Sequence, residues 1–459
     1  MKVITLLCTS FITESYSFLT QPSEFRATIY PLHQSSQRHE IPSWDEIESK
    51  LNPSLTYPKP SVIDSSLNPN DPPQFSTERL TLFRERHGWC PYSERVYLAL
   101  EVMGIPYDTV YIDNTGHGRR PSFFSGQTPQ IRWEDGSTQG ESMDLVRQID
   151  RKYKQASDID LYPTDIQNEV INKSRAFESI FPRRTRPSSR AAFLFRYDGE
   201  PLWKNEFEKV LRETNELLGQ TSADGPFFCG KRFTAADIAW APFLERYAAQ
   251  LPCLHDDLNP RYDDENFPHL VAWYDAMDYF VPVYSCQVKG DASSWRKVLT
   301  MAGFGNAGVP LEVSKRMSDA KYEEARALSI DEKERIQSLW EKYCMSRPWM
   351  ATSPAAEAAS VMTRNRSAIM KDIEKRAVIS HPLLAECTQD GVDVAMRAMV
   401  CLLCQDDLDF RDCELNTRCM SYKEDIVLVA TYLDDRMCVP RDMGCLSAAA
   451  LKRLIPTVQ

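Results

Sequence analysis

The stretch that decides the fold is RLTLFRERHGWCPYSERVYLALEVMG, residues 79–104. Residues 79–84 put their two leucines on one face of an extended chain, which predicts a short strand. Apolar residues then recur at helical spacing over 92–103, and Gly104 stands where glycine commonly ends a helix. Cys90 therefore lies between a strand and a helix.

The following residues continue an α/β pattern. Residues 107–112 predict a second strand, and 130–133 with 137–139 predict a hairpin around a Glu-Asp-Gly turn. A third segment, 142–154, has the apolar spacing of a helix. The order strand, helix, strand, hairpin, helix is that of a thioredoxin-like domain, which we expect over residues 78–155.

The rest of the chain has helical periodicity. We expect a helical domain over 160–305, with a capping box in which Thr234 caps a helix and Asp237 reaches back to the Thr234 N–H. A second helical region, residues 310–459, follows. The predicted fold class is thus α/β plus all-α.

Local signals place several helices in this second region. Ser329 and Glu332 form another capping box, and Pro354 suits the first turn of a helix. Later helices are expected over 391–404, 422–434 and 446–455.

Residues 1–77 are interpreted as a presequence and a proline-rich linker. A basic residue, a short apolar run over 3–12 and the small residues Ser15 to Ser17 are typical of a signal peptide. The Ser-Tyr-Ser-Phe junction at 15–18 resembles that of bipartite plastid presequences in algae. We therefore expect a plastid protein. The alternatives are a disordered cytosolic tail, hence a cytoplasmic protein, and a plain secretory signal.

Composition excludes several classes of protein. The net charge of −11 argues against a nucleic-acid binder, and no apolar run reaches the 18 or so residues that span a bilayer. The thirteen cysteines are thinly spread, which favours free thiols. Cys401 and Cys404 have no second such pair and no histidine at ligand spacing, so we expect no metal site.

Cys90 is the candidate nucleophile. At a helix N-terminus, free backbone N–H groups and the helix dipole favour a thiolate. Position 93 is serine, so no neighbouring thiol can form an internal disulfide, and a second thiol must come from solution. A buried structural cysteine is the alternative.

Two further elements are expected beside Cys90. Thr128-Pro129 precedes a strand, and a cis proline there would turn the Thr128 backbone outward to pair with a peptide. Glu141 and Ser142 open a helix whose N–H groups can bind a carboxylate, while Glu141 can bind an ammonium group. An ordinary trans proline and a simple helix cap are the alternatives.

These residues resemble the glutathione transferase superfamily over about residues 78–300. The Cys-Pro-Tyr-Ser-Glu-Arg run is most similar to cysteine-type members: the omega and lambda classes and dehydroascorbate reductases. Thr128 departs from the valine usual at that position. The resemblance implies that glutathione is a co-substrate, bound by Thr128, Pro129, Glu141 and Ser142, with catalysis by Cys90.

Three functions follow from the resemblance. The first is a glutathione-dependent thiol transferase or reductase acting on a small-molecule or protein mixed disulfide, and we favour it because a cysteine holds the nucleophile position. The second is a binding or scaffold protein of the same fold, and the third is conjugation of glutathione to electrophiles. A homodimer is compatible with each. The basic cluster at 183–190 is expected to be a solvated loop with ion pairs; the alternative is a contact with an anionic substrate or with the glutathione carboxylates.

Overall fold

The computed structural model describes residues 41–51, 62–64, 73–114, 120–182, 185–186, 204–300, 308–406 and 411–458. These residues form two compact units. The larger unit comprises 56–354 and 437–453, and the smaller unit comprises 1–55, 355–436 and 454–459. Of residues 1–77, interpreted as presequence and linker, 1–40, 52–61 and 65–72 lie outside the described residues.

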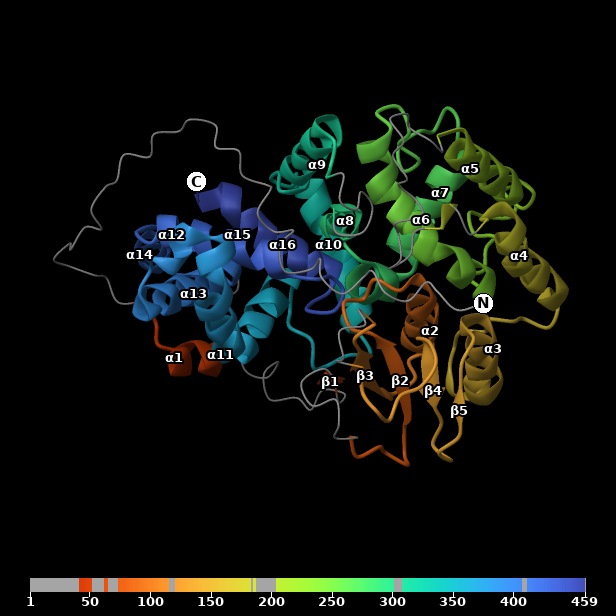
Figure 1. The fold of residues 1–459 in the computed structure, drawn as a ribbon, viewed down its shortest axis with the longest axis horizontal. Helices are drawn as coiled ribbons and strands as arrows, with labels where there is room; N and C mark the ends of the chain where they lie inside the picture. Colours follow the sequence, from red (N-terminus) through yellow and green to blue (C-terminus); the bar gives the residue numbers. More distant parts are fainter. Residues whose placement is uncertain are drawn as a thin grey trace, which may run out of the picture. The chain divides into compact units, whose positions relative to one another are not determined.

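A five-stranded sheet organises the first part of the larger unit. Its strand order is β1-β3-β2-β4-β5, which can be followed from one edge to the other in Figure 1. The strands are β1 Val62–Asp64, β2 Leu80–Glu85, β3 Tyr107–Ile112, β4 Gln130–Arg132 and β5 Thr138–Gln139. β3 runs parallel to both β1 and β2, and β4 is antiparallel to β2 and β5.

Successive side chains of β2 point to opposite faces of this sheet. Leu80 and Leu82 join the main core, which also contains the buried faces of helices α2 (Pro91–Val102) and α3 (Ser142–Tyr153). Phe83 points to the opposite face, where it packs in a smaller cluster with Phe124. The strand-helix-strand-hairpin-helix order confirms the predicted thioredoxin-like architecture.

One part of the sheet corrects the linker interpretation. Val62–Asp64 was expected to be extended linker, but it forms β1 and pairs with Thr109–Tyr111 of β3. Parallel pairing requires a partner distant in sequence, and three residues among prolines carry no periodic signal of their own. The linker interpretation is therefore wrong at these three residues.

The helical part of the larger unit follows the sheet. Its core contains the fully buried rings of Phe177, Trp240, Phe243 and Trp273. The predicted capping box at Thr234 is confirmed, because the Thr234 N–H donates to Asp237 Oδ2 at 2.9 Å while the Thr234 hydroxyl accepts from the start of the helix. The helices are α4 Gln167–Ile180, α5 Lys204–Gly219, α6 Ala235–Leu254, α7 Pro268–Phe280, a π-helical turn Tyr284–Val288, α8 Ala292–Val298, α9 Leu311–Glu324 and α10 Ile330–Cys344.

The remaining chain forms six further helices among the described residues. They are α11 Pro354–Ser380, α12 Pro382–Ala385, α13 Gln389–Leu403, α14 Cys413–Met420, α15 Lys423–Arg436 and α16 Cys445–Val458. Expected segments 391–404, 422–434 and 446–455 match α13, α15 and α16. Helices α9, α12 and α14 were not predicted.

Residues 437–453 return to the larger unit. The Val439 N–H donates to Ser294 Oγ at 3.0 Å, and Lys452 forms a buried ion pair with Asp291. A methyl group on Gly444 would lie only 1.8 Å from the Cys286 carbonyl oxygen, so only glycine fits there. This segment is therefore an integral part of the larger unit.

The smaller unit includes a second segment that was expected to lack structure. Helix α1, Trp44–Leu51, lies beside α13 (Figure 1). Trp44 Nε1 donates to Asp393 at 2.7 Å, and Ile47 is fully buried. Residues 44–51, which were interpreted as part of the presequence, thus form a helix whose apolar face is covered by helices more than 300 positions later in the chain.

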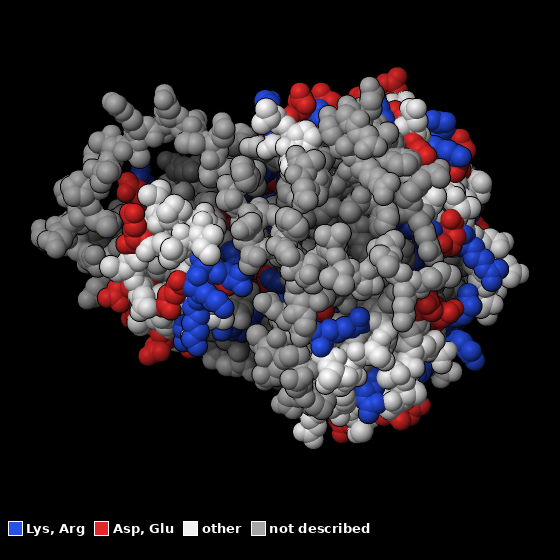
Figure 2. All heavy atoms as spheres, in the orientation of Figure 1, with Lys and Arg blue, Asp and Glu red and all other residues white. Residues whose placement is uncertain are grey.

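Surface charge is mixed. On the face shown in Figure 2, lysine and arginine are interspersed with aspartate and glutamate among the described residues. None of the helices in the described part of the chain combines the length and apolarity needed to cross a membrane.

Candidate functional site

Cys90 lies at the start of α2, where the sequence predicted it. It is the N-cap residue, with an extended backbone, and Pro91 takes the first helical position. Its side chain is 7% exposed and makes no capping hydrogen bond to the helix. Instead, the thiol donates to the Thr128 carbonyl oxygen over 3.7 Å. The sulfur is thus aimed at the loop that precedes β4.

That loop contains the expected cis proline. The Thr128-Pro129 peptide bond is cis. Asn114, which the sequence analysis missed, donates from Nδ2 to Thr128 Oγ1 at 2.8 Å and fixes the threonine side chain. Within the described residues, the Thr128 N–H has no hydrogen-bond partner. A backbone donor is therefore available next to the Cys90 sulfur.

Glu141 and Ser142 open α3. Glu141 has a φ of 65°, and among the described residues it is the one non-glycine residue with a positive φ. A left-handed conformation costs an L-residue roughly 1–2 kcal/mol. Its side chain is exposed and makes no capping hydrogen bond. The helix thus begins with a strained acidic residue that leaves its N-terminal N–H groups uncapped.

Arg95 links these elements. It is 3% exposed, donates to the Ala239 carbonyl oxygen of α6 through Nε at 2.9 Å and Nη2 at 2.6 Å, and reaches Ser142 Oγ at 3.5 Å. Burial lowers the pKa of Arg95 to about 10, so the side chain stays cationic at neutral pH. One buried guanidinium therefore ties α2 to both α3 and α6.

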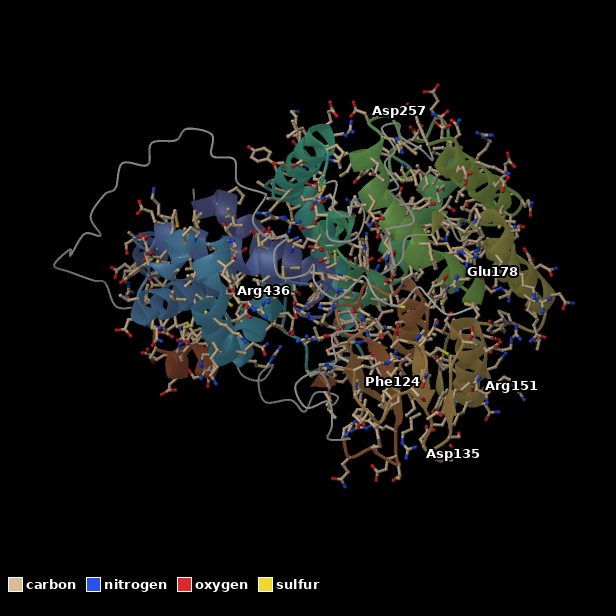
Figure 3. The ribbon with its side chains drawn as sticks, viewed as in Figure 1. Phe124, Asp135, Arg151, Glu178, Asp257 and Arg436 are labelled. Carbon is tan, nitrogen blue, oxygen red and sulfur yellow. The ribbon has the colours of Figure 1, made fainter. Side chains whose placement is uncertain are left out.

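A second buried arginine lies close by. Arg186 donates to the Phe181 carbonyl oxygen at 2.6 Å, to Tyr92 Oη at 3.3 Å and to Glu178 Oε2 at 2.7 Å. Glu178 lies on α4, where Figure 3 labels it. The expectation of a solvated loop with ion pairs at 183–190 is therefore half right for Arg186, which pairs with Glu178 but is only 7% exposed. Arg183, Arg184 and Arg190 lie outside the described residues.

The loop before Cys90 is held by Glu85. Its carboxylate accepts the backbone N–H groups of His87 at 2.9 Å and Trp89 at 2.7 Å. The His87 and Trp89 rings stack with centroids 4.4 Å apart. The residues that lead into the thiol are thus fixed by backbone hydrogen bonds to one buried side chain.

The structure brings most of the predicted site residues together. Cys90 contacts Thr128 directly, and Ser142 connects to the Cys90 helix through Arg95. Sequence reasoning missed Asn114 and Glu85, whose partners lie in loops without a periodic pattern. Their signal was weak, since each is one polar residue beside a strand end.

The other cysteines form no recognised metal centre. Over the described ranges, no group of three or more His, Cys, Asp or Glu side chains is arranged to hold a metal ion. Cys401 on α13 and Cys404 at its C-cap are both buried.

Comparison with known proteins identifies two domains. The model of the glutathione S-transferase N-terminal domain matches residues 89–152, and that of the C-terminal domain matches residues 201–276. The first match includes Cys90 and the Glu141-Ser142 helix start, and the second includes the Thr234 capping box.

Individual relatives agree with these matches. Glutathione S-transferase-like protein gedE of Aspergillus terreus is 25% identical over 218 residues, which cover 42% of this chain and 88% of the relative. Glutathione S-transferase L2, chloroplastic, of Arabidopsis thaliana is 25% identical over 200 residues, covering 41% of this chain and 60% of the relative. The crystal structure of glutathione transferase Omega 3C from Trametes versicolor is 20% identical, with a TM-score of 0.35, covering 46% of this chain and 84% of that one. Residues 89–152 and 201–276 of this chain are therefore similar to the N- and C-terminal domains of glutathione S-transferases.

Proposed function

We propose that the protein is a glutathione-dependent thiol transferase in which Cys90 is the nucleophile. The observation that carries this proposal is a single thiol at the N-terminus of α2, facing the Thr128 carbonyl at 3.7 Å and lying 7% exposed. A helix N-terminus stabilises the thiolate, which is the reactive form of a cysteine.

The proposed reaction has two balanced steps. The Cys90 thiolate attacks the glutathione sulfur of a mixed disulfide between glutathione and a substrate thiol, the sulfur–sulfur bond breaks, and the substrate leaves as a thiolate that takes up a proton. Cys90 is then bound to glutathione by a new disulfide. A second glutathione thiolate attacks this disulfide, which releases oxidised glutathione and restores Cys90. Ser93 is 2% exposed and offers no second thiol.

The residues around Cys90 fit the tripeptide. Its backbone can pair with the Thr128 N–H, which has no partner among the described residues, as a strand would. The uncapped N-terminus of α3 suits the γ-glutamyl carboxylate, and Glu141 supplies a counter-charge for the ammonium group. Thr128, Pro129, Glu141 and Ser142 are thus the proposed glutathione site.

Turnover of a small mixed disulfide, followed through oxidised glutathione with a coupled reductase, tests this function. Cys90→Ser is expected to lower activity to the rate without enzyme, whereas Ser93→Ala is expected to stay within about twofold of wild type, because position 93 takes no part. Glutathione binding without turnover in the wild type would favour the scaffold function. Full activity in Cys90→Ser would refute the mechanism.

We also propose a plastid destination, a thioredoxin-like domain over 78–155 to which β1 adds an edge strand, a helical domain over 160–305, and a homodimer. The plastid proposal is supported by the signal-like residues 1–18 and by the name of the chloroplastic relative from Arabidopsis thaliana. A fluorescent protein fused behind residues 1–77 should accumulate in plastids of an algal host. Accumulation in the cytosol or in the medium would contradict it.

A further inference from the structure

A buried charged cluster lies at the first turn of α2. It consists of Glu94 from α2 with Glu245 and Arg246 from α6, and none of the three is more than 4% exposed. Arg246 Nη1 lies 2.9 Å from Glu94 Oε2 and donates to Glu245 Oε1 at 3.3 Å. One guanidinium therefore serves two carboxyl groups.

The same guanidinium reaches the loop that leads into the thiol. Arg246 Nη2 points toward the backbone carbonyl oxygens of Trp89 at 3.3 Å and Gly88 at 3.5 Å. Its face lies 3.7 Å from the centre of the Trp295 ring. The peptide that joins Trp89 to Cys90 is thus held by a side chain from the helical domain.

We propose that Arg246 is a positioning residue for Cys90: it fixes the Trp89–Cys90 peptide relative to Glu94 one turn later, and so sets the direction of the thiol. This inference rests on the proposed role of Cys90. Only arginine can hold the Trp89–Cys90 peptide and both carboxyl groups at once, because its planar guanidinium presents several N–H donors in fixed directions. A lysine ammonium is a single point charge.

The charges of the cluster support a positioning role. Burial raises the pKa of Glu94, and burial with the neighbouring Glu94 charge raises the pKa of Glu245 well above its usual range. Tyr284 Oη donates to Glu245 Oε2 at 2.9 Å, and Arg84 on β2 is the other cation that faces Glu94. Buried ion pairs contribute little net stability compared with packed apolar residues. Because the cluster adds little to the free energy of unfolding, we infer that its role is to fix the geometry of the loop before Cys90.

The test compares Arg246→Lys with the matched control Arg296→Lys. Arg296 is also about 4% exposed, but its two side-chain hydrogen bonds of 2.7 Å both go to Glu324 on α9 and not to the 85–90 loop. Both variants are expected to lower the melting temperature. Only Arg246→Lys is expected to lower kcat/KM for mixed-disulfide turnover, by about tenfold, because a small misplacement of a nucleophile is costly.

Two further readouts separate positioning from folding. Glutathione affinity by calorimetry is expected to stay within about twofold in Arg246→Lys, since the proposed Glu141 and Ser142 contacts are untouched. The rate at which iodoacetamide labels Cys90, mapped by peptide mass spectrometry, is expected to change at least about threefold. If Arg246→Lys does not fold, the double variant with Glu94→Gln and Arg246→Gln takes its place in the test. It removes the two opposite charges together, so neither is left buried without its partner.

Unchanged turnover and labelling in Arg246→Lys, or an equal loss in Arg296→Lys, would overturn the positioning role. A different result is expected if the proposed function itself is wrong. In that case the wild type itself does not turn over mixed disulfides, while the labelling rate still reports on the position of the Cys90 thiol.

Discussion

Replacing Glu141 with glycine separates backbone strain from ligand binding. Glu141 holds a φ of 65°, which costs an L-residue roughly 1–2 kcal/mol. Glycine adopts this conformation freely but gives up about 0.5–1 kcal/mol of chain entropy on folding. The net expectation for Glu141→Gly is a free energy of unfolding between about equal to wild type and about 1.5 kcal/mol higher.

Glutathione affinity, unlike stability, should fall in this variant. Both Glu141→Gly and Glu141→Ala remove the proposed counter-charge of the ligand ammonium group, so both are expected to weaken binding about tenfold or more. Glu141→Ala keeps the strained backbone and therefore should be less stable than Glu141→Gly by about 1 kcal/mol. Thermal unfolding and calorimetry on the three proteins test this. A Glu141→Gly protein that is less stable than the Glu141→Ala protein would refute the strain argument. Unchanged glutathione affinity in both variants would refute the binding role of Glu141.

Three other perturbations test the fold. Asp237→Ala leaves four buried donors without this acceptor and should destabilise by at least about 3 kcal/mol in chemical unfolding. Asp237→Asn keeps Oδ1 for the Phe228 N–H and for Trp273 and should cost less. Burial lowers the pKa of His255 to about 4, so its stability contribution is complete above about pH 6.5 and is lost as pH falls toward 4. His255→Gln should therefore lose less melting temperature than wild type between pH 7 and 5; an equal loss would contradict the assignment. Ile47→Ala, at a fully buried position of the smaller unit, should cost about 2–5 kcal/mol, and a cost below 1 kcal/mol would mean that α1 is not docked.

Local patterns were enough to predict the elements that carry the site. The Thr234 capping box, the helix start at Cys90 and the hairpin before α3 each depend on residues only a few positions apart. Their hydrogen bonds are made within the element, as with the 2.9 Å contact from the Thr234 N–H to Asp237. The spacing of these residues in the sequence was therefore sufficient to predict their hydrogen bonds.

Contacts between distant segments could not be predicted in this way. β1 depends on pairing with β3, and Trp44 depends on an acceptor 349 positions away. Arg246 approaches the carbonyl of Trp89 across 157 positions. Such partners are fixed by how the domains pack, and a single sequence gives no periodic signal for them.

The central claim is that Cys90 forms a disulfide with glutathione. Incubation of the wild type with oxidised glutathione, followed by peptide mass spectrometry, measures this directly at each cysteine. The expected result is a glutathione adduct on the Cys90 peptide that forms first, is removed by added glutathione, and is absent in Cys90→Ser. An unmodified Cys90 beside modified cysteines elsewhere would contradict the claim.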